Sequence, residues 1–197
     1  TRVSGVRTVG GTMPASAVIL ATGGSSYTAT GSSGDGYAMA EKLGHTIVPL
    51  RPALVPLIVE EIPLAKSMQG VSLKNVRLTA FQGRADEIDV ALTPAADVGR
   101  GIAGKKPRPP VIESRMGEMM IAHFGIGGPV TLLMSLATVK ALEEGPVSVS
   151  IDLKPVVSAQ ELRMRLQREF EQSSKRSFRR ILGELLPSKM IEPYIIL

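Results

Sequence analysis

The longest uninterrupted apolar run near the start of the chain, residues 17–21, leads into a loop rich in glycine and serine. Such a run is typical of a strand that is buried on both faces of a parallel sheet. Before it, the segment VRTV and Gly10-Gly11 predict a first strand and a hairpin turn. After the loop, residues 37–43 fit a short helix that Gly44 ends. Strand, glycine loop and helix together predict a βα unit, the organisation in which proteins hold nucleotides.

The middle of the chain changes pattern where four prolines, Pro49, Pro52, Pro56 and Pro63, follow one another closely. Prolines at this spacing interrupt regular structure and predict a crossing between domains. Beyond them, VSLKNVRLTAFQG (71–83) and VSVSIDLKP (147–155) predict strands. Between the two we expect a loop over residues 93–110 and a helix with Pro129 in its first turn and Gly145 at its end.

The last quarter of the chain has helical periodicity. Ser158 and Glu161 have the spacing of a capping box. The apolar residues that follow recur at helical spacing in two stretches, Leu162, Leu166 and Phe170, then Phe178, Ile181, Leu182 and Leu185. Lysines and arginines occupy the other faces of these two predicted helices. A solvated helix face explains them best, and a nucleic-acid interface is the alternative.

Composition narrows the class of protein. The chain has 197 residues, 44% hydrophobic and 21% charged, which is typical of a globular protein. It has no cysteine, so disulfides and thiolate metal sites are excluded, and its two histidines predict no metal site. We find no signal sequence and no apolar run of the roughly 20 residues that a membrane helix needs. We therefore expect a cytoplasmic protein with no membrane partner.

The net charge is +5, but aromatic residues make up only 4% of the chain and tryptophan is absent. Proteins that bind single-stranded nucleic acid stack bases on aromatic side chains, so this composition argues against a nucleic-acid partner. One formal dinucleotide fingerprint occurs, Gly99-Arg-Gly101-Ile-Ala-Gly104. It is followed by KKPRPP, which cannot begin the required helix, so we interpret the match as chance.

The loop after residues 17–21 is the best candidate site. Its two glycine clusters, ATGG and GDG, need glycine either for tight turns alone or for the close approach of a ligand to the backbone. At the start of a helix, free backbone N–H groups favour an anion or an oxygen-rich ligand. The pattern by itself leaves both interpretations open.

Five segments of the chain resemble a known family. VILATGG with GDGYAMAEKLGH resembles the flavoproteins related to fumarate reductase and aspartate oxidase, and MQGVSLKNVRL, GEMMIAHFGIGGP and IDLKP narrow the similarity to the bacterial BaiN/YhiN-type FAD-dependent oxidoreductases. The resemblance implies an α+β chain, a piece of a Rossmann-like FAD domain followed by an insert. It implies domains at residues 1–52 (FAD domain), 53–155 (small β-barrel) and 156–197 (helical bundle).

The resemblance also implies a function. The chain would be the central part of an FAD-dependent oxidoreductase of a small organic substrate, with NAD(P)H as a candidate electron donor, and would be inactive alone. The residues beside the cofactor would be Thr22, Gly23, Gly24, Gly34, Asp35 and Gly36. Tyr27 and His123 are weak catalytic candidates, and His45 fits a turn. The alternative is a non-enzymatic binding module whose barrel and basic helices engage nucleic acid or a protein.

Overall fold

The computed structural model describes residues 3–92, 109–172 and 177–196. The chain divides into two compact units, residues 1–50 and 51–197. The division falls among the four prolines, where the sequence predicts a crossing between domains. The predicted Gly99–Gly104 fingerprint and most of the predicted 93–110 loop lie outside the described residues. The finer boundaries at residues 52 and 155 stay predictions.

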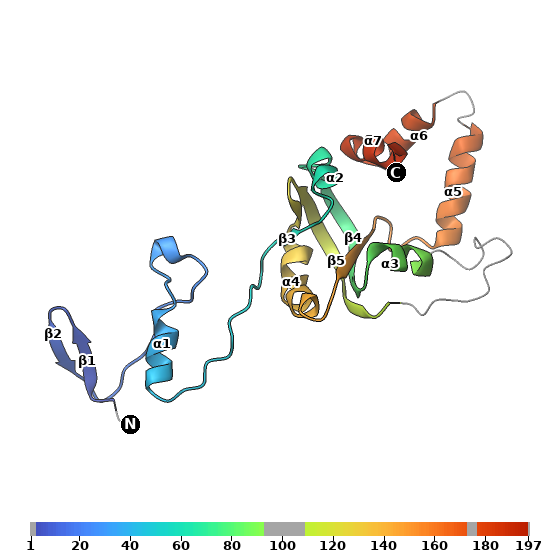
Figure 1. Ribbon diagram of the computed structural model, residues 1–197. Helices are drawn as coiled ribbons and strands as arrows, with labels where there is room; N and C mark the ends of the chain where they lie inside the picture. Colours follow the sequence, from blue (N-terminus) through green and yellow to red (C-terminus); the bar gives the residue numbers. More distant parts are fainter. Residues whose placement is uncertain (1–2, 93–108, 173–176, 197) are drawn as a thin grey trace. The chain divides into compact units, whose positions relative to one another are not determined.

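The first unit contains a hairpin and a short helix (Figure 1). Strands β1 (Gly5–Thr8) and β2 (Gly11–Pro14) pair antiparallel, with Thr8 opposite Gly11. The predicted hairpin turn is present, but Val9 and Gly10 form it and Gly11 begins β2, so it lies one residue before the predicted Gly10-Gly11. A 3-10 turn, η1 (Thr28–Thr30), precedes helix α1 (Asp35–Lys42). Gly44 follows α1 with a φ of 95° and donates its N–H to Glu41 O at 2.9 Å, which confirms the predicted helix end.

The predicted strand over residues 17–21 is wrong for this structure. The second strand of the hairpin is β2 instead of residues 17–21, and residues 17–24 form neither a helix nor a strand. Val18 and Leu20 are exposed, and Ile19 is 92% exposed. An apolar run forms a buried strand only when other strands supply hydrogen bonds on both sides. The sheet that the described part of the first unit contains is the two-stranded hairpin, so this run has no sheet to join.

The second unit is built on a curled, half-barrel sheet of five antiparallel strands in the order β3-β6-β5-β4-β7 (Figure 1). The strands are β3 (Leu57–Ile58), β4 (Ser72–Gln82), β5 (Val111–Ala122), β6 (Gly125–Gly127) and β7 (Val147–Asp152). The predicted strands at 71–83 and 147–155 are therefore confirmed as β4 and β7. Strand β5, the longest, was not predicted.

Helix α4 (Pro129–Leu142) covers one face of this sheet and closes the core. Val130 and Met134 of α4 are buried, and Val130 packs beside Gly117 of β5. Pro129 lies in the first turn of α4 and Gly145 follows its end, as predicted. The buried apolar core comprises Ala65, Val71, Leu73, Val76, Leu78, Ala80, Met119, Ile121, Ile126, Val130 and Met134. Two short helices, α2 (Ile62–Ser67) and α3 (Ala85–Leu92), flank the sheet.

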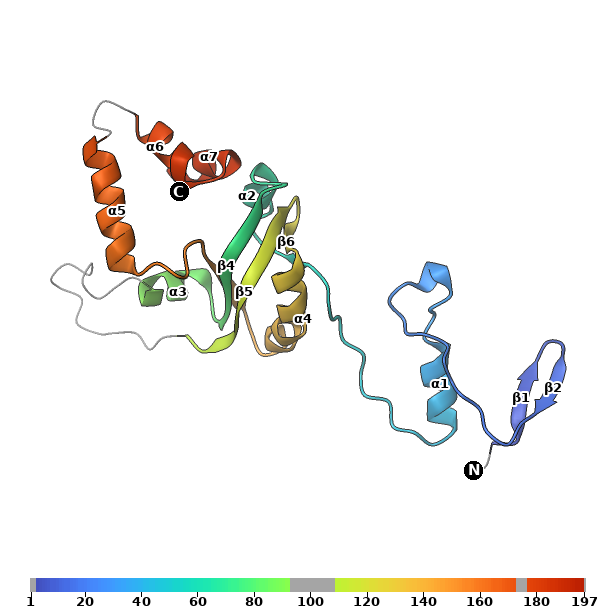
Figure 2. The same cartoon turned by 180° about the vertical axis from the view of Figure 1, so that it is seen from behind.

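Three helices end the second unit, α5 (Ala159–Gln172), α6 (Phe178–Leu185) and α7 (Ser188–Ile196) (Figure 2). Ile181 and Leu182 of α6 are buried, as the helical spacing predicts. Met190 of α7 packs against the core of the sheet, and Lys189 Nζ donates to Gln69 O at 2.7 Å. These contacts attach α6 and α7 to the sheet through α2 and the turn after it.

Candidate functional site

The two glycine clusters of the first unit lie against each other. The backbone N–H of Gly34 donates to Gly24 O at 3.1 Å. This bond joins the ATGG segment to the start of α1 across a loop of nine intervening residues. The structure therefore brings the six predicted residues together at one place: Thr22, Gly23, Gly24, Gly34, Asp35 and Gly36. Their role toward a cofactor stays a prediction.

At Gly36, the start of α1 approaches Thr22 so closely that a side chain would not fit. Gly36 is buried in the first turn of α1, and a Cβ atom on it would overlap Thr22 Oγ1. The Cβ of Thr22 would lie 3.6 Å from that added atom, an ordinary contact. Residue 36 can therefore carry a side chain only if the hydroxyl of Thr22 moves away, and glycine lets the two segments touch.

Backbone conformation explains two more glycines. Gly23 and Gly34 have φ values of 78° and 84°, in the left-handed region that other residues adopt only at a cost. Gly34 is the N-cap residue of α1 and supplies no side-chain cap. The first turn of α1 carries the exposed carboxylate of Asp35 instead. That negative charge complements the helix dipole and makes this end of the site unfavourable for a phosphate but suitable for a ligand with hydroxyl donors.

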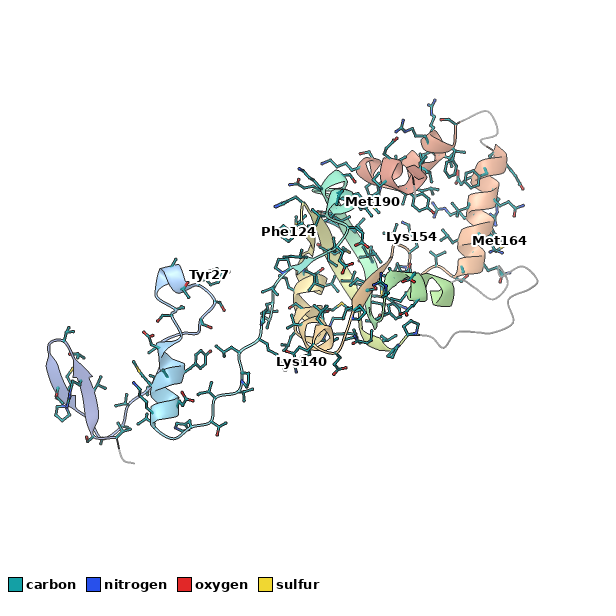
Figure 3. All side chains as sticks on the ribbon, viewed as in Figure 1. Tyr27, Phe124, Lys140, Lys154, Met164 and Met190 are labelled. Atoms are coloured by element: carbon teal, nitrogen blue, oxygen red, sulfur yellow. The ribbon has the colours of Figure 1, made fainter. Side chains whose placement is uncertain are left out.

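The catalytic candidates of the sequence lie outside this cluster. Tyr27, labelled in Figure 3, is 75% exposed and precedes η1. Its backbone carbonyl accepts a hydrogen bond from Thr30 Oγ1 at 2.8 Å. His45 donates its backbone N–H to Ala40 O at 3.1 Å, in the turn that ends α1, so its interpretation as a turn residue is confirmed.

His123 lies in the second unit, in the turn between β5 and β6. It is exposed, and its ring meets Phe124 edge to face with the centroids 4.9 Å apart. The glycines beside it serve packing. A Cβ on Gly125 would overlap Leu57 O, and one on Gly128 would lie 2.9 Å from Met119 Cα. The glycines of this segment therefore let β6 and the start of α4 approach their neighbours closely.

Sequence reasoning missed one residue of the glycine cluster, Tyr37. Its ring lies within van der Waals distance of the space beside both Gly24 and Gly34. The sequence pattern assigns Tyr37 only to the start of a helix. The feature that could have indicated its place in the cluster is an aromatic residue directly after GDG.

Neither a metal site nor a membrane-spanning helix is found within the described ranges 3–92, 109–172 and 177–196. No three side chains of histidine, aspartate or glutamate gather there as a metal site would require. No helix in the same residues is long and apolar enough to cross a membrane.

Comparison with known proteins relates these features to a family. Residues 109–196 match the family model described as the HI0933-like protein barrel and H2TH domain. The chain is 30% identical over 187 residues to the 3-dehydro-bile acid delta(4,6)-reductase of Clostridium scindens, which covers 94% of this chain and 39% of that protein. It is 28% identical over 179 residues to the Ribosomal RNA dihydrouridine synthase of Haemophilus influenzae, which covers 90% of this chain and 35% of that protein.

The chain thus spans well under half the length of both relatives. The match to the family model covers β5 to α7, and both alignments extend over nearly the whole chain, including the glycine cluster. Residues 109–196 carry the HI0933-like barrel and H2TH domain, and this match confirms the resemblance to the BaiN/YhiN-type flavoproteins that the sequence indicates.

Proposed function

We propose that this chain is part of a longer FAD-dependent oxidoreductase, and that its glycine cluster lines the cofactor. The observation that carries the proposal is the closure of residues 22–24 on residues 34–36 through the Gly34–Gly24 hydrogen bond. Backbone that is not covered by side chains can approach a planar or sugar-like ligand closely. The match to a flavoprotein family makes FAD the ligand to test first.

The residues present fit one wall of such a site. Gly23 is exposed and supplies backbone without a side chain, and Asp35 supplies a carboxylate that accepts from hydroxyl groups. We assign Asp35 to a ribityl or ribose hydroxyl rather than to the pyrophosphate, because its charge repels phosphate. FAD would supply the redox chemistry, and the protein would bind it, orient it and exclude water.

The proposed substrate is a small organic molecule. One relative is named as a reductase of a 3-dehydro-bile acid, which supports reduction of an unsaturated small molecule, with NAD(P)H as the donor to test. Such a reduction also needs a proton donor, and Tyr27 and His123 are the candidates that the sequence offers. Both are exposed, so an approaching substrate could reach either side chain.

RNA is the second candidate substrate, because the other relative is named as a ribosomal RNA dihydrouridine synthase. The basic helices bear on this candidate. Helix α5 carries arginines and glutamates in equal number: Arg163, Arg165, Arg168, Glu161, Glu169 and Glu171. On α6, Arg179 pairs with Glu192 of α7. This balance of charge favours a solvated helix face over a surface built for phosphate groups.

The test uses the full-length protein that contains this chain. We expect it to purify with flavin absorbance, to release FAD on denaturation, and to oxidise NAD(P)H in the presence of an enone-type substrate. A protein free of flavin that cannot be reconstituted would refute the proposal. The double variant Arg165→Glu, Arg168→Glu separates the substrates, because turnover of a small molecule should not change. A salt-sensitive loss of RNA binding in that variant would favour the second candidate.

A further inference from the structure

We propose that Tyr37 is a positioning residue of the cofactor site, whose ring holds the Gly23–Gly24 turn against the start of α1. This inference rests on the proposed function, since the groups that it positions are those assigned to FAD. It extends that function by naming a side chain that would order the site before the cofactor arrives.

The position of the Tyr37 ring is given by the two glycines that it lies beside. A Cβ on Gly34 would lie 3.5 Å from Tyr37 Cδ2 and 4.0 Å from Cε2. A Cβ on Gly24 would lie 3.5 Å from the phenol oxygen at the far end of the same ring. The ring therefore extends from Gly34 to Gly24, along the two segments that the Gly34–Gly24 hydrogen bond joins.

The backbone of Tyr37 is fixed by the same turn. Its N–H donates to Gly34 O at 3.0 Å, while the N–H of Gly34 donates to Gly24 O at 3.1 Å. Gly34 thus binds the ATGG turn on one side and Tyr37 on the other. Because Tyr37 is half-buried, its ring shields part of this arrangement from water.

A hydrogen bond near the surface contributes little by itself, because water competes for both partners. In residues 3–50, the described part of the first unit, the sheet is the β1-β2 hairpin, and the ATGG segment pairs with neither of its strands. Among the described residues, the side chains beside these glycines are Ser32 at Gly23, Ser25 at Gly34, Thr22 and Leu20 at Gly36, and Tyr37 at Gly24 and Gly34. Tyr37 thus lies beside a glycine of each of the two segments. Glycine has no side chain to pack, so an aromatic ring lying on its backbone supplies the missing contact.

The consequence concerns the affinity for FAD. A loop that is already ordered loses less conformational entropy when the ligand binds, so its affinity is higher. Removing the ring should leave both glycine segments able to touch FAD but free to separate before it binds. We expect Tyr37→Ala to weaken FAD binding by about tenfold or more, equivalent to one decade in Kd.

The experiment compares FAD affinity in the full-length protein for the wild type, Tyr37→Ala, Tyr37→Phe and Met39→Ala. Tyr37→Phe keeps the ring beside Gly34 but removes the phenol oxygen beside Gly24, so it should lose less FAD affinity than Tyr37→Ala. Met39→Ala removes an exposed side chain from the same helix and is the matched control. Tyr37→Leu replaces Tyr37→Ala if the latter does not fold, and should give an intermediate loss. Visible circular dichroism of the flavin, recorded with FAD in excess, reports whether the bound ring is still held in one orientation.

Each result is decisive. Loss of affinity and of flavin dichroism in Tyr37→Ala or Tyr37→Leu, with a smaller loss in Tyr37→Phe and none in Met39→Ala, supports the assignment. Unchanged affinity in all variants overturns it, and so does an equal loss in Tyr37→Phe, because ring packing would then not be the cause. A wild-type protein that binds no FAD would instead refute the proposed function, so the two failures are distinguishable.

Discussion

At the scale of single residues, the contact between Thr22 and Gly36 gives the sharpest test of the glycine cluster. A methyl group on residue 36 would overlap Thr22 Oγ1 but not Thr22 Cβ. In the full-length protein, Gly36→Ala should therefore reduce FAD content, and the double variant Thr22→Ala, Gly36→Ala should recover part of it. Fluorescence titration with FAD measures both effects.

The matched control for that variant is Gly183→Ala on α6. A Cβ there would lie 3.7 Å from Ile191 Cδ1, an ordinary contact, and alanine has the higher helix propensity. Gly183→Ala should leave FAD content unchanged and cost no stability. If Gly36→Ala keeps its FAD as Gly183→Ala does, the two segments are not held together as the structure shows.

The six residues assigned to the cofactor come from the resemblance to a flavoprotein family, and their role stays a prediction, but the meeting of the two glycine clusters has a local cause. ATGG and GDG lie near each other in sequence, so a short loop brings them together almost regardless of the rest of the fold. Tyr37 could not be predicted in the same way. Its significance depends on the direction of its ring toward Gly24, and helical periodicity says nothing about contacts with a turn that lies outside the helix.

At the scale of elements, the capping box at the start of α5 was predicted from sequence and is present. Ser158 Oγ accepts from the N–H of Glu161 at 3.2 Å, and the carboxylate of Glu161 accepts from the N–H and the hydroxyl of Ser158 at 3.0 and 2.7 Å. The hydrogen bonds from the hydroxyl and the backbone N–H of Ser158 lower the pKa of the Glu161 carboxyl below its usual value. The folded cap therefore favours the carboxylate.

This shift predicts a pH dependence of α5. Because the folded pKa is lowered, the contribution of Glu161 is present above its unfolded pKa and is lost as the pH falls through the folded value. The ¹³Cα chemical shifts of residues 159–161 should report fraying of the first turn below about pH 4. Glu161→Gln should remove that pH dependence. Ser158→Ala should destabilise the helix by about 1 kcal/mol at neutral pH. Fraying at low pH that persists in Glu161→Gln would assign the effect to another group.

Elements with a clear period were the ones that sequence could predict. Strand β7 alternates Val147, Val149 and Ile151 with serines, and these apolar residues pack against the core as expected. Strand β5 reads VIESRMGEMMIA, and its solvent-facing side chains include Met116 and Met120. Its apolar and polar positions do not alternate, so no period marks it. Helix α2 was obscured by Pro63, which is tolerated there because it lies in the first turn.

At the scale of the whole molecule, the wrong prediction for residues 17–21 has a physical reason. The run AVILA has the composition of a central strand, but a strand is completed by neighbours that can lie far away in sequence. The described residues supply none, and Ile19 is 92% exposed beside the exposed side chains of Val18 and Leu20. Because the chain covers only 39% and 35% of its two relatives, we expect the neighbours of this run in the rest of the full-length protein.

That expectation predicts a different response in two versions of the protein. In the 197-residue chain alone, amides of residues 17–21 should exchange with solvent without protection, and Ile19→Asp should leave the melting temperature unchanged because the side chain is already exposed. In the full-length protein the same amides should be protected. Ile19→Asp should there destabilise the fold by about 3 kcal/mol or more, because it buries an unpaired charge in a sheet.

The 197-residue chain should also fail to retain FAD through gel filtration, since the contacts of the glycine cluster must meet the entropic cost of association without the rest of the site. Stoichiometric FAD on that chain, or equal effects of Ile19→Asp in both versions, would show that residues 17–24 need no further strands to form the site.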